Sequence, residues 1–277
     1  MTTPRAFRAV SLDLWYTTIA PGPGDERRWK DARVRVLESH TTNADGSAID
    51  RHRIDETLTH LLADLESHGR MLETIDPKTV VQEMVERLRA QWKVPADETA
   101  RAYSAAGLSE HPPRINPEAT ALAKHLHGLG VPVISITNTA RREASWQEMF
   151  LAHRGPRFER IVASCEVGRA KPDPEIFLEA ARRIALDPQE ILHVGDRWDL
   201  DVEGALRSGF GAVLYRGLWP LYPEGLVPDV RDHADASADS RDSSAVMRVD
   251  HLEEILDPDR FVWSSNETRS NASPSRA

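Results

Sequence analysis

The chain has 277 residues, of which 40% are hydrophobic and 29% are charged, and its formal net charge is −9. Such an acidic chain is not expected to bind nucleic acid, which requires a basic face, although a local cation or metal could hold a small phosphorylated molecule. No apolar run approaches the roughly 20 residues that cross a bilayer, and the single cysteine, Cys165, excludes an intrachain disulfide and a cysteine-based zinc site. We therefore expect a cytoplasmic protein without a membrane partner.

The first half of the chain contains one strand pattern followed by a long block of helical periodicity. Residues 8–14 are a short apolar run that carries Asp13 at its end, and a loop rich in proline and glycine follows. From residue 27 to residue 109, apolar residues recur at spacings of three and four, which is typical of amphipathic helices. The helices expected in this block cover residues 29–40, 54–68, 79–92 and 96–108. Because the block interrupts a chain of alternating strands and helices, we interpret it as an inserted domain.

The second half of the chain alternates between strand and helix patterns. Asn116 is expected to cap the helix that begins at Pro117. Strands expected at residues 131–137, 160–164, 190–196 and 211–216 are separated by helices expected at residues 117–127, 140–153, 174–185 and 201–209. This alternation predicts an α/β fold with a Rossmann-like, doubly wound parallel sheet.

Polar residues suited to phosphoryl transfer lie at or after the ends of the predicted strands. In a doubly wound sheet these ends form the ligand-binding edge. Two carboxylates there can hold a hard cation such as Mg²⁺, and a lysine can help to neutralise a phosphoryl group. A carboxylate can also attack phosphorus and form an aspartyl phosphate. The residues that provide these groups are Asp13, Thr137, Asn138, Lys171, Asp196 and Asp201.

The order and context of these residues resemble the four motifs of the haloacid dehalogenase-like (HAD) superfamily. The matches are D-x-x-x-T at residues 13–17, T-N at residues 137–138, K-P-D-P-x-I-F at residues 171–177 and G-D-x-x-x-x-D at residues 195–201. The resemblance covers about residues 8–220. The position of the helical insert resembles the subfamily with a cap between motifs one and two. It implies a core of residues 1–22 and 112–260 and a helical cap of residues 23–111, and we expect a disordered tail from residue 261 to residue 277.

The resemblance implies a role for each residue of the first and fourth motifs. Asp13 would be the nucleophile and a metal ligand, and Asp196 would be a second ligand of Mg²⁺. The family also uses the backbone carbonyl two residues after the nucleophile, which here belongs to Trp15. Asp201 would support the metal site from nearby. We expect Thr17 to support the nucleophile loop through a local hydroxyl hydrogen bond.

The other two motifs supply contacts to the substrate, which would be a small phosphorylated molecule. Thr137 would donate a hydrogen bond to the phosphoryl oxygens, with Asn138 beside it. Lys171 would neutralise charge and orient Asp13. The cap would exclude water and select the substrate.

Trp15 departs from the pattern of the phosphatases in this superfamily. They carry a second aspartate at this position, which protonates the leaving group and then activates the hydrolytic water. An indole has no proton to exchange near neutral pH and cannot perform either task. Tyr16 follows where the family usually has a small residue, so two bulky aromatic residues narrow the pocket beside Asp13.

The departure at Trp15 leaves two alternatives to a phosphatase. The 2-haloacid dehalogenases commonly have an aromatic residue at this position and need no metal. Asp196 argues against this alternative, because that branch has a small hydroxyl residue there and a carboxylate would repel a haloacid. The second alternative is a HAD-fold binding protein whose hydrolytic chemistry has been lost, because a fold alone does not determine function.

Overall fold

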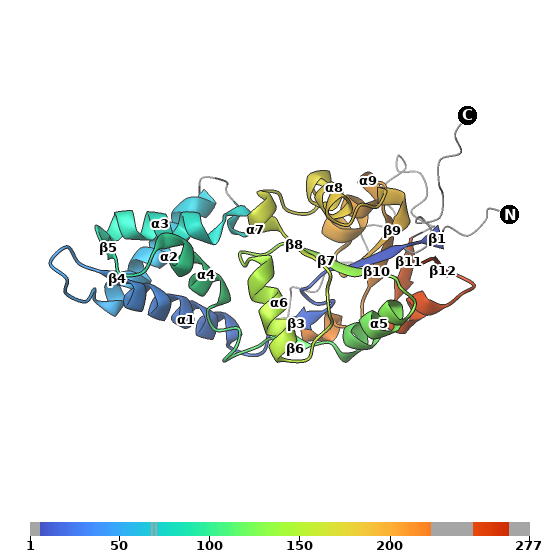
Figure 1. The fold of residues 1–277 in the computed structure, drawn as a ribbon, viewed down its shortest axis with the longest axis horizontal. Helices are drawn as coiled ribbons and strands as arrows, with labels where there is room; N and C mark the ends of the chain where they lie inside the picture. Colours follow the sequence, from blue (N-terminus) through green and yellow to red (C-terminus); the bar gives the residue numbers. More distant parts are fainter. Residues whose placement is uncertain (1–5, 68, 70, 223–245, 266–277) are drawn as a thin grey trace, which may run out of the picture.

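A six-stranded parallel sheet lies at the centre of the computed structural model, which describes residues 6–67, 69, 71–222 and 246–265 (Figure 1). Every pair of neighbouring strands is parallel. In spatial order the strands are β11 (Met247–Val249), β10 (Gly211–Tyr215), β9 (Ile191–Gly195), β2 (Ala9–Leu12), β7 (Val133–Thr137) and β8 (Ile161–Ala163). Because β2 is central and the chain continues to either side of it, the carboxyl ends of β2, β7 and β9 lie next to one another.

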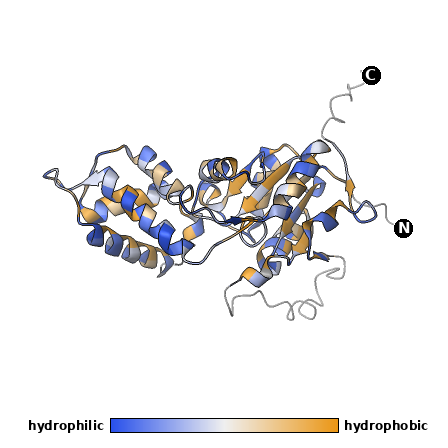
Figure 2. Ribbon diagram, turned by 90° about the horizontal axis from the view of Figure 1, so that it is seen from below, coloured by the Kyte–Doolittle hydropathy of each residue, from blue (hydrophilic) through white to orange (hydrophobic). Residues whose placement is uncertain are grey.

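Helices cover both faces of this sheet. On one face, α5 (Pro117–Gly128) and α6 (Glu143–Ala152) pack with Val10 and Leu12 of β2 in one hydrophobic cluster. On the other face, α8 (Pro174–Arg183) and α9 (Glu203–Arg207) pack with Ala9 in a second cluster. Strands buried on both faces are apolar along most of their length, and Figure 2 shows the sheet as largely hydrophobic. The predicted α/β fold with a doubly wound parallel sheet is confirmed.

The long helical block forms a separate layer beside the sheet, which we call the helical unit (left in Figure 1). It contains α1 (Asp25–His40), α2 (Arg51–Ser67), α3 (Pro77–Leu88) and α4 (Ala96–Ala105), together with the short turn η1 (Leu72–Thr74) and the ribbon of β4 (Thr41–Thr42) and β5 (Gln91–Trp92). These helices bury their apolar faces against one another in their own hydrophobic cluster, which includes Leu37, Leu58 and Met84. The four helices expected from periodicity are therefore present.

Three helices begin with the same local signal, an aspartate or asparagine followed by proline. Asp76, Asn116 and Asp173 each accept a hydrogen bond from the backbone N–H two residues later, at the start of α3, α5 and α8. Proline fits the next position because its missing N–H would have no partner inside the helix. The cap predicted for Asn116 is confirmed. Its amide also donates to the backbone oxygen of Thr17 at 2.8 Å, which ties α5 to the loop after β2.

Several polar contacts join the helical unit to the central sheet and the helices that cover it, which we call the sheet layer. The connecting segments form a ribbon of β3 (Ile19–Ala20) and β6 (Arg114–Ile115). The guanidinium of Arg142, which precedes α6, pairs with the carboxylate of Asp76 at the start of α3. Ser164 donates to the backbone oxygen of Glu73 at 2.5 Å, at the start of α7 (Ser164–Val167). These contacts hold the helical unit over the carboxyl ends of β7 and β8.

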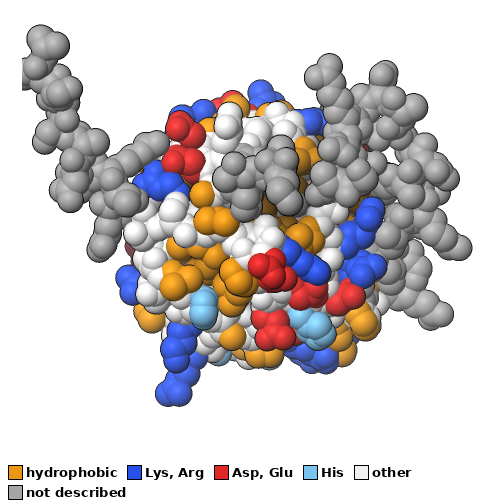
Figure 3. All heavy atoms as spheres, turned by 90° about the vertical axis from the view of Figure 1, so that its right-hand side faces the viewer, with side chains coloured by type: hydrophobic (Ala, Val, Ile, Leu, Met, Phe, Trp, Pro, Cys, Tyr) orange, Lys and Arg blue, Asp and Glu red, His pale blue; other side chains and the backbone are white. Residues whose placement is uncertain are grey.

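The C-terminal part of the described chain packs at the opposite end of the molecule. The turn η7 (Leu252–Leu256) follows β11, and β12 (Val262–Trp263) pairs with β1 (Ala6–Phe7) in a parallel ribbon, with the turn η2 (Pro188–Glu190) nearby. Figure 3 shows hydrophobic, acidic and basic side chains mixed at this end. Residues 261–265 were predicted to belong to the tail, but Phe261 is buried among Phe7 and Trp263. Their aromatic packing explains the difference.

Two predictions remain, which are the rest of the disordered tail and the absence of a membrane-spanning segment. Residues 266–277 of the predicted tail lie outside the described residues. Within residues 6–67, 71–222 and 246–265, no helix combines the length and the apolar character needed to cross a bilayer.

Candidate active site

The residues predicted for the site meet at the carboxyl ends of adjacent strands. Asp13 follows β2, Thr137 ends β7 and Asp196 follows β9. Lys171 lies in the loop before α8, and Asp201 lies in η3 (Trp198–Val202), a π-helical turn shortly after β9. All five side chains are buried. The parallel topology therefore brings these residues together from four separate parts of the sequence.

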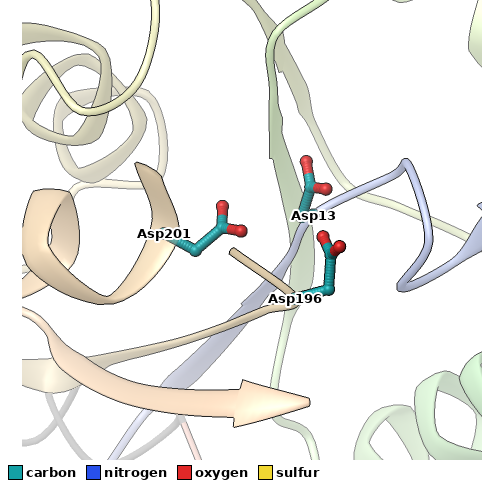
Figure 4. A group of neighbouring side chains, drawn as sticks. All are labelled: Asp13, Asp196 and Asp201. Atoms are coloured by element: carbon teal, nitrogen blue, oxygen red, sulfur yellow. The ribbon is translucent and has the colours of Figure 1, made fainter. Parts of the chain in front are cut away.

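Three buried carboxylates converge at this edge of the sheet (Figure 4). One oxygen from each of Asp13, Asp196 and Asp201 lies within 4.8 Å of the others. Burial raises the pKa of Asp13 to about 6 against the opposing effect of Lys171. Burial, followed by the charges of Asp201 and Asp13, raises the pKa of Asp196 well above its ordinary value. Like charges at this separation favour the uptake of a proton or a cation, and a hard divalent cation such as Mg²⁺ fits a set of carboxylate oxygens.

Lys171 connects two of these carboxylates. Its Nζ donates to Oδ1 of Asp13 at 2.6 Å and to Oδ1 of Asp201 at 2.5 Å. Burial lowers the pKa of Lys171, but the two carboxylates outweigh burial and raise it, so the ammonium stays charged. Asn138 fixes the lysine loop, because its amide donates to the backbone oxygen of Lys171 at 3.0 Å and accepts from the backbone N–H at 2.7 Å. This positioning role was not predicted for Asn138, and its contact with phosphoryl oxygens stays a prediction.

Asp201 is held by a chain of buried polar groups that extends below the site. Burial raises the pKa of Asp201, but Lys171 and His193 outweigh it, and the net pKa lies below the ordinary value. The Nε2 of His193 lies 3.2 Å from Oδ1 of Asp201, and its Nδ1 lies 2.6 Å from the hydroxyl oxygen of Ser11. Burial lowers the pKa of His193, which favours the neutral ring with Nε2–H donating to Asp201. Ser11 is fully buried and cannot reach a substrate in solvent. We therefore infer that this chain of hydrogen bonds holds the Asp201 carboxylate in position.

The threonines near the nucleophile differ in their hydrogen bonding. Thr18, rather than Thr17, supports the nucleophile loop, because its hydroxyl donates to the backbone oxygen of Asp13 at 2.7 Å. Within the described residues, the buried hydroxyl oxygens of Thr17 and Thr137 have no hydrogen-bond partner. The role expected for the Thr17 hydroxyl is therefore wrong, because the chain turns so that the next residue reaches Asp13. A buried hydroxyl without a partner is costly, and at Thr137 it is suited to a ligand oxygen.

Trp15 packs its side chain between the two layers of the molecule. Its ring lies 5.9 Å from the ring of Trp29 in α1 and 5.6 Å from the ring of Trp146 in α6, measured between centroids. Trp15 thus links the nucleophile loop to the helical unit through aromatic packing. The coordination of a metal by its backbone carbonyl stays a prediction.

Tyr222 is a site residue that the sequence did not predict. Its hydroxyl donates a short hydrogen bond to Oδ2 of Asp196, and its ring stacks on the ring of Tyr16 at 3.6 Å between centroids, with an interplanar angle of 19°. It follows the turn η4 (Trp219–Leu221) after β10, outside the four motifs and without a periodic pattern. The sequence therefore carried no signal that would place it beside Asp196.

A cavity adjoins this aromatic pair. Its volume is about 460 Å³, and its lining includes Tyr16, Gly22, Arg27, Arg114 and Leu221. Arg27 and Arg114 are exposed. The cavity offers room for a small organic group next to the nucleophile loop.

The chain matches the family model of the haloacid dehalogenase-like hydrolases over residues 25–209. It is 30% identical over 129 residues to a glyceraldehyde 3-phosphate phosphatase of Methanopyrus kandleri, which covers 45% of this chain and 55% of the relative. It is 34% identical over 116 residues to a phosphoserine phosphatase of Thermus thermophilus, which covers 42% of this chain and 46% of the relative. The chain thus spans about half of the length of these relatives.

Solved structures share the fold over nearly the whole chain. A 2-haloacid dehalogenase from Pseudomonas syringae pv. Tomato has a TM-score of 0.52 at 19% identity and covers 90% of this chain and 96% of its own. A HAD phosphatase from Thermococcus onnurineus has a TM-score of 0.51 at 16% identity and covers 91% of this chain and 98% of its own. The match to the family model extends over more than half of the sequence, and the chain belongs to the haloacid dehalogenase-like hydrolase family.

Proposed function

We propose that the protein is a Mg²⁺-dependent phosphatase that hydrolyses a small phosphorylated metabolite through an aspartyl phosphate at Asp13. The observation that carries this proposal is the cluster of three buried carboxylates, with oxygens within 4.8 Å, beside the bridging amine of Lys171. A cluster of this kind suits a divalent cation and a phosphoryl group together. The relatives that are named as phosphatases support the same proposal.

In this proposal, a carboxylate oxygen of Asp13 attacks phosphorus, the bond from phosphorus to the substrate oxygen breaks, and that oxygen takes a proton from water. A water molecule then hydrolyses the aspartyl phosphate, which releases phosphate and restores Asp13. Lys171 orients the Asp13 carboxylate and offsets the negative charge of the phosphoryl oxygens. The hydroxyl of Thr137 donates to one of those oxygens, and Asn138 holds the loop of Lys171. Mg²⁺, when bound by Asp13, Asp196 and the carbonyl of Trp15, would supply further charge neutralisation.

The helical unit acts as the cap in this proposal, with core residues 1–22 and 112–260 and cap residues 23–111. Its contacts with the sheet layer through Asp76 and Glu73 would keep water from the carboxyl ends of the strands. The leaving group would occupy the cavity beside Tyr16, whose lining carries both signs of charge, from Arg27 and Arg114 and from Asp25 and Glu26.

The acidity of the site favours phosphate chemistry over dehalogenation. A metal-free dehalogenase must bind the carboxylate of a haloacid close to its nucleophile. Here Asp196 lies beside Asp13 and would repel that carboxylate in a site without a metal, whereas Mg²⁺, when bound, would offset the same repulsion of a phosphoryl group.

The expected result of a substrate screen is EDTA-sensitive release of phosphate from at least one small monoester. Release of chloride from 2-chloropropionate is not expected with or without Mg²⁺, because of the repulsion at Asp196. Phosphate and chloride can be measured colorimetrically in parallel, with Asp13→Asn as the inactive control. Metal-independent release of chloride would replace this proposal with the dehalogenase. No turnover of any phosphate or haloacid would favour a binding protein.

The metal can be tested without a substrate. Asp196→Asn should weaken Mg²⁺ binding in isothermal titration calorimetry by more than the roughly 10–100-fold that the loss of an outer-shell partner typically costs. Asp199→Asn is a matched control, because the substitution removes the same charge three residues away. Asp199 lies on the surface and pairs with Arg197. Equal affinity of wild type and Asp196→Asn would remove Asp196 from the metal site.

A further inference from the structure

Tyr222 connects two parts of the proposed metal site that are otherwise separate in the sequence. One part is the nucleophile loop, which holds Asp13 and Trp15, and the other is Asp196 after β9. The hydroxyl of Tyr222 donates to Oδ2 of Asp196, while its ring lies on the ring of Tyr16. A single side chain thus contacts both parts.

The contact with Asp196 restricts the rotation of a carboxylate that the chemistry needs in one orientation. A carboxylate at the end of a strand can turn about its bond to Cβ, and burial makes each poorly satisfied orientation costly. A tyrosine hydroxyl that donates to one oxygen selects one of these orientations. Groups that hydrogen-bond to a metal-ligating side chain orient it in this way and tune its affinity for the metal.

The contact with Tyr16 fixes the tyrosine in turn. Tyr16 has a φ of 55°, in the left-handed region that residues with a side chain rarely adopt. Its backbone N–H donates to the oxygen of Ile19 at 2.6 Å, which closes the nucleophile loop on itself. The ring of Tyr16 therefore stands on a constrained backbone, and the stacked ring of Tyr222 has a firm support.

We infer that Tyr222 is a positioning residue that orients Asp196 for a divalent cation and couples that orientation to the nucleophile loop through Tyr16. This inference rests on the proposed function, because it assumes that Asp196 is a metal ligand. It assigns to Tyr222 no contact with the substrate and no transfer of a proton.

The experiment compares the binding of Mn²⁺, a spectroscopic substitute for Mg²⁺, by electron paramagnetic resonance in the wild type and three variants. Tyr222→Phe keeps the stacked ring and removes the hydroxyl, so we expect binding about 10-fold weaker. Tyr16→Leu keeps the hydroxyl of Tyr222 and removes the ring on which Tyr222 stacks, so we expect a smaller weakening of Mn²⁺ binding. Tyr103→Phe is the matched control and should bind as the wild type does, because Tyr103 lies in α4, within the hydrophobic cluster of the helical unit.

The outcomes separate this inference from the proposed function. No binding of Mn²⁺ by the wild type would overturn the metal site and the inference with it. Binding by the wild type with equal or tighter binding by Tyr222→Phe would overturn the inference alone, and tighter binding would mean that the hydroxyl competes with the metal. Thermal unfolding without metal should be similar for the wild type and Tyr222→Phe, which excludes a general loss of structure. If Tyr222→Phe does not fold, equal affinities of wild type and Tyr16→Leu would contradict the coupling.

Discussion

Replacing Lys171 with methionine is expected to lower the proposed phosphatase activity and the stability of the protein together. The change keeps the apolar stem and removes the ammonium that pairs with Asp13 and Asp201. Loss of one fixed charge-stabilising group typically lowers kcat on the order of 10²–10³-fold. Breaking a buried ion pair by removing one partner typically costs about 3–5 kcal/mol of unfolding free energy, because the other charge stays buried. Steady-state assays and urea unfolding in EDTA measure the two effects, and Lys124→Met on the exposed face of α5 is the control.

The stability loss of Lys171→Met should be larger at pH 7 than at pH 5. Without the lysine, the folded-state pKa of Asp13 rises further above its value in the unfolded chain, and the pKa of Asp201 rises because the ammonium no longer holds it below its ordinary value. A carboxyl group with a raised folded-state pKa loses stabilisation as the pH increases from its unfolded pKa to its folded pKa. Below that interval the carboxyl groups are protonated and no longer repel one another. A stability loss that is equal at both pH values would show that Lys171 contributes through packing alone.

A burst of leaving group, close to one per active site, should precede a slow steady state when the wild type meets an activated aryl phosphate. Asp13 has a pKa of about 6, so most of it is ionised at pH 7 and can attack. An aryl leaving group needs no proton. Hydrolysis of the aspartyl phosphate needs a base near the attacking water, and Trp15 supplies none. Because general acid–base catalysis is typically worth about 10²–10⁴-fold, this second step should limit turnover.

Stopped-flow absorbance measures the amplitude of the burst against the concentration of active sites. Asp13→Asn should show no burst, because the acceptor of the phosphoryl group is gone. Fast linear turnover by the wild type would contradict the prediction and would mean that another residue, such as Tyr16 or one in the helical unit, provides the base. The wild type is the informative protein here, because Trp15→Asp would also remove the ring between Trp29 and Trp146.

The sequence predicted the residues whose positions follow from topology. Asp13, Thr137 and Asp196 each lie at the end of an apolar run, and parallel strands must bring such ends together. The two-residue strands β1 and β12 were not predicted, because two residues leave no periodic pattern. The choice between Thr17 and Thr18 depends on the turn of one loop, which motif spacing does not specify.

Tyr222 and Trp15 show a different limit of the sequence. The hydrogen bond of Tyr222 to Asp196 joins residues 26 positions apart across a loop, and a lone tyrosine in such a loop has many alternative contacts. The identity of Trp15 predicted the absence of an acid, but only the structure shows that its ring packs against Trp29 and Trp146.

The aromatic packing of Trp15 also constrains how this protein can evolve. An aspartate at this position would provide the missing acid, but it would leave a cavity beside Trp29 and Trp146 and place a carboxylate among indole rings. Truncation of a large aromatic core residue typically costs about 3–5 kcal/mol, and the loss of the half-buried Trp15 ring should cost a sizeable part of that. An aspartate introduced by itself is therefore expected to lower the stability of the protein. We expect an aspartate to be tolerated better when substitutions in α1 and α6, the helices that carry Trp29 and Trp146, refill the space left by the indole.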